Sequence, residues 1–93
     1  NQYLNESERR QAPCLRRALL AARRAWRDGR VSVAALCRLA EREIGREPAA
    51  RLEYFELVDA LTLEPLTRAR RGCVAAAAAR IGRTRLIDNL RLR

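Results

Sequence analysis

Apolar residues recur at helical spacing through the first half of the chain. Asn5 and Glu8 have the spacing of a capping box, which predicts a helix start. Pro13 lacks a backbone N–H, so it predicts a kink or a restart soon afterwards. One apolar stripe then runs to the stop signal Asp28-Gly29, and it contains Leu15, Ala18, Leu19, Ala22 and Trp26.

A second helix follows, with Ser32 as its cap and with Gly45 and Pro48 at its end. Its apolar side consists of Val33, Leu36, Cys37, Ala40 and Ile44. The other side pairs opposite charges at i, i+3 spacing, namely Arg38 with Glu41 and Glu43 with Arg46. Such pairs are typical of a solvent-exposed helix face.

The second half changes to a period of two. Residues 51–59 alternate and predict a strand, in which Leu52, Tyr54, Glu56 and Val58 share one face. Residues 59–66 predict a turn, residues 68–71 a charged loop and residues 84–92 a strand. The segment 73–81 is ambiguous, because five consecutive alanines favour a helix while Gly72 and Gly82 bracket only a strand's length. Taken alone, its composition favours the helix.

Length and composition limit what the chain can be. Its 93 residues form one domain, 1–93, and no apolar run is long enough to span a membrane. The chain begins at Asn1 and contains no Met, so we expect it to be part of a longer protein. The formal net charge is +9, and all 20 basic residues are Arg. This bias has two readings: an acidic partner, or the codon usage of a GC-rich genome.

Few residues are suited to catalysis. The chain has no His, and its serines lie at predicted helix starts. Cys14, Cys37 and Cys73 are too few and too widely spaced for a structural zinc site, so we expect buried, reduced cysteines. Four carboxylates lie on or beside the predicted strands of the second half, namely Glu53, Glu56, Asp59 and Asp88. Most such groups are neutralised by arginines. We therefore predict no catalytic residue and no metal ligand.

One face of the first helix is strongly basic. It carries Arg16, Arg17, Arg23, Arg24 and Arg27. Trp26 lies on the apolar stripe instead, so the aromatic–basic mixture of a single-strand binding surface is missing. The charge pattern leaves open a small nucleic-acid-binding or interaction module, with an oligomerisation module as a third reading.

Three segments carry a resemblance to a known family. The first is the opening Asn1-Gln2-Tyr3-Leu4, followed by a capped helix and Ala12-Pro13-x-Leu15. The second is LEYFELVDALTLEPL from Leu52, and the third is residues 80–89, which contain TRLIDN. They resemble the pantothenate synthetase (pantoate–β-alanine ligase) family, of which TRLIDN is characteristic. The likeness extends over essentially the whole chain in order. Asn5 and Glu6 depart from it, because the family commonly has Ser-Pro there.

The resemblance implies the C-terminal domain of an ATP-dependent ligase. That enzyme joins pantoate to β-alanine through a pantoyl adenylate, with ATP and Mg as cofactors, in the cytoplasm and as a homodimer. Asn1 would be the last residue of a Ser-Ser-Arg-Asn motif that contacts the nucleotide, and a Rossmann-like N-terminal domain of the same chain would hold the remaining machinery. Neither a membrane nor nucleic acid is an expected partner. The isolated domain is expected to bind no cofactor and to be inactive.

The implied fold is α+β, with two helices packed on a three-stranded antiparallel sheet as a small lid domain. This fold makes residues 73–81 a strand, against their helix propensity. Residues 1–4 would lie near the hinge, 5–46 would form the helical part and 51–92 the sheet. Arg83 and Arg85, beside Gly82, are candidates to face the nucleotide, and exposed hairpin arginines are the alternative.

Overall fold

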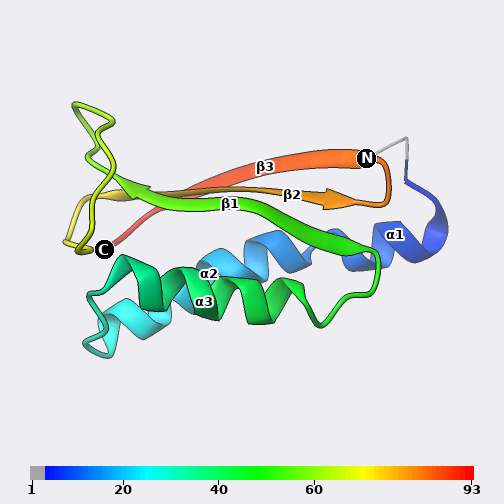
Figure 1. Cartoon of the computed structure of the whole chain (residues 1–93), viewed down its shortest axis with the longest axis horizontal. Helices are drawn as coiled ribbons and strands as arrows, with labels where there is room; N and C mark the ends of the chain where they lie inside the picture. Colours follow the sequence, from blue (N-terminus) through cyan, green and yellow to red (C-terminus); the bar gives the residue numbers. More distant parts are fainter. Residues whose placement is uncertain (1–3) are drawn as a thin grey trace.

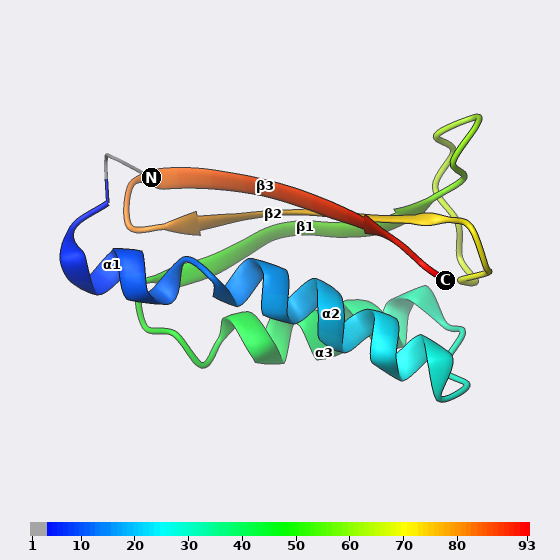
Figure 2. The same cartoon turned by 180° about the vertical axis from the view of Figure 1, so that it is seen from behind.

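The structure, a computed structural model that describes residues 4–93, has a helical layer and a sheet layer. Its elements are α1 (Glu6–Gln11), α2 (Cys14–Arg27), α3 (Val33–Ile44), β1 (Ala50–Val58), β2 (Val74–Ile81) and β3 (Thr84–Arg91). The three strands form an antiparallel sheet in the order β1-β2-β3. All three helices lie on one side of the sheet, as Figures 1 and 2 show from opposite directions. The predicted α+β class is confirmed.

The first helical segment is bent as its sequence predicts. The Glu8 N–H donates to Asn5 Oδ1 at 2.8 Å, and the Asn5 N–H donates to Glu8 Oε1 at 3.1 Å, which completes the capping box. Helix α1 ends at Gln11 and α2 begins at Cys14, so the break coincides with Pro13. Together α1 and α2 form one long, bent helix.

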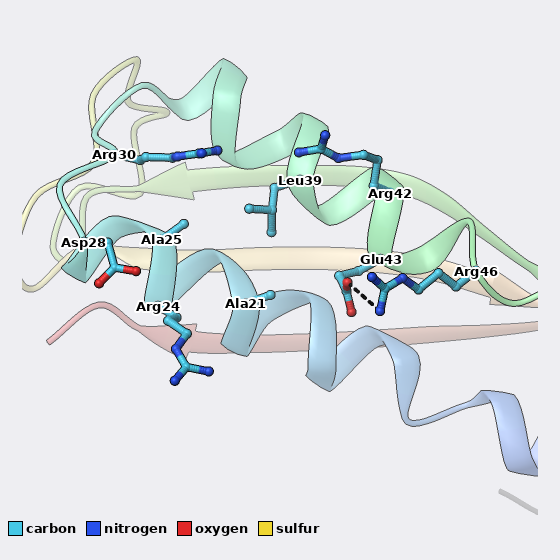
Figure 3. A pocket seen from close by; sticks show the side chains of 9 residues that line it. All are labelled: Ala21, Arg24, Ala25, Asp28, Arg30, Leu39, Arg42, Glu43 and Arg46. Atoms are coloured by element: carbon cyan, nitrogen blue, oxygen red, sulfur yellow. Dashed lines mark ion pairs between the residues drawn. The ribbon is translucent and has the colours of Figure 1, made fainter.

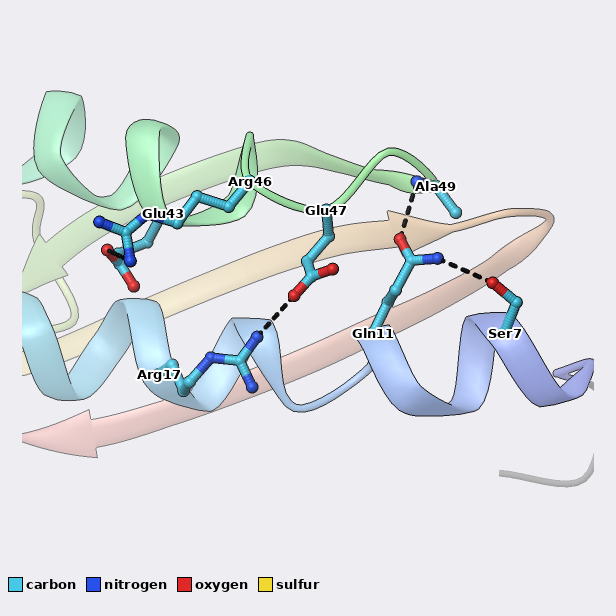
Figure 4. A network of polar contacts seen from close by, with 7 residues as sticks. All are labelled: Ser7, Gln11, Arg17, Glu43, Arg46, Glu47 and Ala49. Atoms are coloured by element: carbon cyan, nitrogen blue, oxygen red, sulfur yellow. Dashed lines mark hydrogen bonds and ion pairs between the residues drawn. The ribbon is translucent and has the colours of Figure 1, made fainter.

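A buried glutamine fixes this bend against the α3–β1 connection. The Gln11 side chain is only 8% exposed, its Nε2 donates to Ser7 Oγ at 3.2 Å, and its Oε1 accepts from the Ala49 N–H at 2.8 Å (Figure 4). Arg17 and Glu47 form an ion pair at 2.9 Å across the same gap. Because buried polar atoms need partners, the network holds α1 in one position.

The apolar stripes of the two long helices form the core. Four stripe residues of α2 are buried, namely Leu15, Ala18, Leu19 and Ala22. Trp26 is half-buried, with the Arg71 guanidinium 5.6 Å from its ring centroid. The three cysteines are free, as predicted, and Cys14 and Cys73 are buried. The expectation of burial is wrong for Cys37, which is only half-buried.

The alanine run is the middle strand of the sheet. Ala75, Ala77 and Ala79 of β2 face the helices and are at most 1% exposed. Since alanine carries only a methyl group, the helices can approach the centre of the sheet closely. Burial against the helices and pairing to two neighbours therefore outweigh helix propensity. The observed bounds of the three strands differ from the predicted ones by no more than one residue at either end.

The predicted alternation in the first strand is interrupted by a β-bulge. Leu52 pairs with Ala79 and Tyr54 with the adjacent Ala78, so Glu53 is an extra residue without a partner. Leu52 consequently faces the helices whereas Tyr54 faces away, and the expectation that they share a face is wrong. A bulge redirects side chains locally, and this one places Glu53 beside arginines of the other strands.

Candidate functional site: the uncovered face of the sheet

The sheet face opposite the helices is covered by no other helix or strand of the described residues. Figures 1 and 2 show it as the upper side of the molecule, and within residues 4–93 only the β1–β2 connection rises beside one end of it. Paired residues of neighbouring strands share a face, so the register gives its composition row by row. We call this surface the uncovered face.

Three arginines form a row across one end of the uncovered face. Arg51 of β1 pairs with Arg80 of β2, which in turn pairs with Arg85 of β3. Like charges directly opposite each other destabilise a sheet. The row lies beside the β2–β3 turn, where the N-terminal part of the domain also packs, since a Cβ added at Gly82 would be 1.8 Å from Glu8 Oε2.

A single carboxylate partly neutralises this row. Glu53 accepts from Arg85 Nε at 2.7 Å and from Arg80 Nε at 2.8 Å. Hydrogen bonds from Arg85 first, then from Arg80, hold the pKa of Glu53 below its ordinary value. The Arg85 guanidinium also lies 5.9 Å from the ring centroid of Tyr54. These contacts fix the guanidinium groups through one edge and leave other N–H donors at the surface.

The next row along the uncovered face is apolar. It consists of Tyr54, Ala78 and Ile87. Tyr54 is 37% exposed and Ile87 62%, while Ala78 between them is fully buried. This row thus places one aromatic and one aliphatic side chain at the surface, next to the charged row.

The β1–β2 connection carries two further exposed leucines. Asp59 holds the turn by accepting from the N–H groups of Leu61 and Thr62 at 2.8 and 2.9 Å, and it is paired with Arg70. These bonds lower the pKa of Asp59 to about 2, the backbone N–H groups acting most strongly. Leu61 is 94% exposed, and Leu63 is 68% exposed with a left-handed φ of 62°. Leu61 and Leu63 are thus held in solvent by the β1–β2 connection, at the end of the sheet opposite the arginine row.

The residues predicted from the sequence to form a site do not all lie in the same place. Asn1 lies outside the described residues, so its predicted nucleotide contact stays a prediction. Arg85 belongs to the arginine row, whereas Arg83 is in the β2–β3 turn, where its carbonyl accepts from Arg80 Nη1 at 3.5 Å. Sequence reasoning missed Arg51, Arg80 and the bridging role of Glu53. Only the strand register, with its bulge, could have revealed them.

The four carboxylates do not converge on one site. Glu53 and Glu56 lie on the uncovered face, and Asp59 holds its loop. Asp88 faces the helices and binds Arg16 at 3.0 Å. Three of the four are therefore bound by arginines, as the sequence analysis expected. Residues 4–93 contain no group of His, Cys, Asp or Glu placed to hold a metal ion.

The basic face of α2 offers less free charge than its sequence suggests. Arg16 binds Asp88, Arg17 binds Glu47, and Arg27 Nε donates to the Arg93 carbonyl at 2.7 Å. Arg24 instead borders an open groove between α2 and α3 (Figure 3). Other arginines at its edge are Arg30, Arg42 and Arg46, and Asp28 and Glu43 are interspersed with them.

The thiols are not suited to nucleophilic chemistry. Burial is the main cause that raises the pKa of Cys14 and of Cys37, which keeps both protonated near neutral pH.

No helix of the described part has the length and apolar character needed to cross a membrane. Fold and surface together define a two-layer α+β domain in which the helices cover one face of the sheet and leave the other open.

Comparison with known proteins identifies the family. Residues 1–91 match the family described as pantoate-beta-alanine ligase. A pantothenate synthetase of Koribacter versatilis is 43% identical over 90 residues, covering 97% of this chain and 31% of that protein. A bifunctional pantoate ligase/cytidylate kinase of a Synechococcus strain is 42% identical over 92 residues, covering 99% of this chain and 17% of that protein.

A solved structure gives the same answer. The pantothenate synthetase of Thermus thermophilus superposes with a TM-score of 0.84 at 40% identity, covering 99% of this chain and 33% of that one. The chain belongs to the pantoate–β-alanine ligase family. It spans about a third of the length of the pantothenate synthetases that it matches.

Proposed function

We propose that this chain is the C-terminal lid of an ATP-dependent ligase that joins pantoate to β-alanine. The observation that carries the proposal is a match over nearly the whole chain to one third of such enzymes, combined with a sheet face that nothing in the described residues covers. The other two thirds would include a Rossmann-like N-terminal domain that holds the nucleotide. The uncovered face of the sheet would close over the bound nucleotide.

The reaction explains the need for a lid. A carboxylate oxygen of pantoate attacks the α-phosphorus of ATP, which forms pantoyl adenylate and releases pyrophosphate. The amine of β-alanine then attacks the acyl carbon, an amide bond forms, and AMP leaves. Water can replace the amine in the second step, so a cover that excludes water protects the mixed anhydride.

The residues of the chain suit a cover better than a catalytic centre. The sequence has no His, and residues 4–93 hold no metal-binding cluster. Mg is proposed as a cofactor of the complete enzyme, together with ATP. Asn1, the proposed last residue of the nucleotide-contacting motif, would connect the lid to the catalytic part. We further propose that the complete enzyme works in the cytoplasm as a homodimer.

A chimaera tests the proposal. The matching third of the Thermus thermophilus enzyme is replaced by residues 1–93, and pantothenate formed is measured against AMP released. A closed lid gives one pantothenate per AMP. The same enzyme truncated before this third should release AMP with little pantothenate, because the adenylate hydrolyses. A chimaera no better than the truncated enzyme would contradict the proposal.

A further inference from the structure

We propose that the row of Arg51, Arg80 and Arg85 binds the phosphate chain of a linear polyphosphate. If the proposed function holds, this anion is the triphosphate of the nucleotide and then the pyrophosphate that it releases. The row would make the lid a participant in nucleotide binding as well as a cover. The contacts to the phosphates would be made by the three arginine side chains of this domain.

Charge is the first argument for this site. Three guanidinium groups against the one Glu53 carboxylate leave the row itself with a net charge of +2, and the Glu8 carboxylate lies beside it at Gly82. Directly opposed like charges cost stability, and the sheet positions could carry neutral residues without loss of pairing. A row that is unfavourable in the free domain becomes favourable when a polyanion lies along it, because each arginine then gains a charged acceptor.

Geometry is the second argument. Neighbouring strands lie about 4.8 Å apart, so the three arginines start from positions along a line across the sheet. Arg80 and Arg85 lie on the two oxygens of the Glu53 carboxylate, and Arg51 extends the row by one strand. Glu53 engages the Nε atoms of Arg80 and Arg85, and within the described residues the terminal Nη atoms of Arg85 have no acceptor. An extended chain of phosphates fits such a row better than a single phosphate does.

A hollow beside the row is the third argument. Arg51 and Arg80 line it together with Gly82 and residues 48–50, where backbone lies at the surface. The hollow lies at the end of the sheet next to α1, whose Glu8 carboxylate reaches Gly82.

Binding of inorganic triphosphate to this 93-residue chain tests the site independently of the lid. Calorimetry measures affinity, and the Nε–H signals of the arginines in NMR spectra locate the anion. We expect triphosphate to bind more tightly than sulfate and to shift the signals of Arg80 and Arg85. Arg80→Gln and Arg85→Gln should each lower the affinity about tenfold or more. Arg24→Gln, which removes the same charge from the helical groove, should change it less than twofold.

Glu53→Gln separates anion binding from a purely structural network. It raises the net charge of the row while keeping an acceptor oxygen, so it should strengthen triphosphate binding. The proposal is overturned if Glu53→Gln weakens binding as the arginine variants do, if Arg24→Gln matters equally, or if no shifts occur in the row of the wild-type chain. Failure of the chimaera with intact triphosphate binding would instead reject the lid and retain the anion site.

Discussion

Ala77 lies at the centre of the interface between sheet and helices, where an added side chain has no room. It is 1% exposed, faces the helices and has Phe55 and Asp88 as its register partners. Ala77→Leu adds three heavy atoms there, and overpacking of this kind costs about 1–3 kcal/mol. In a domain of this size each kcal/mol lowers Tm by about 4–8 °C, so we expect a fall of about 5–20 °C.

The adjacent alanine is the matched control. Ala76 lies on the uncovered face, between Glu56 and Asn89, and is only half-buried. Ala76→Leu should therefore change the free energy of unfolding by no more than about 0.5 kcal/mol. Thermal and urea unfolding followed by circular dichroism measure both variants. Equal losses for the two would refute the assignment of β2 as a strand with one buried and one open face.

Three further predictions concern the loop, the bend and the chemistry. The folded pKa of Asp59, about 2, lies below the ordinary 3.8, so its contribution to stability is full above about pH 4 and is lost as the pH falls through 2. Asp59→Asn should consequently flatten the urea-unfolding profile between pH 4 and 2. Gln11→Ala leaves the Ala49 N–H without its acceptor and should lower the free energy of unfolding by about 1–3 kcal/mol, whereas a loss near zero would show that water replaces the amide. The isolated chain should release no pyrophosphate from ATP and pantoate, and a pyrophosphate assay that found turnover would place catalytic groups in this domain.

Local signals in the sequence were sufficient to predict the helices and their ends. The Asn5 capping box, the break at Pro13 and the two apolar stripes each depend on residues within a few positions of one another. The alanine run shows the limit of such reasoning. Its propensity favours a helix, and only pairing with β1 and β3, formed by residues distant in sequence, makes it a strand.

The candidate site depended on contacts that no local pattern specifies. Arg51, Arg80 and Arg85 are 29 residues apart at one step and five at the other, and they share a row only because of the sheet register. Glu53 reaches them through a bulge that the alternating pattern concealed. The basic face of α2 was conspicuous in the sequence, yet Asp88 and Glu47 from other elements occupy two of its arginines.

The most direct test of the account asks which surface the rest of the enzyme covers. Hydroxyl-radical footprinting of the chimaera, with ATP and pantoate bound, reports the exposure of single side chains. Tyr54 and Ile87, 37% and 62% exposed here, should be protected relative to the isolated chain. Leu20, 40% exposed on α2, should react unchanged. Protection of Leu20 with Tyr54 and Ile87 still reactive would show that the helical layer, and not the sheet, faces the active site.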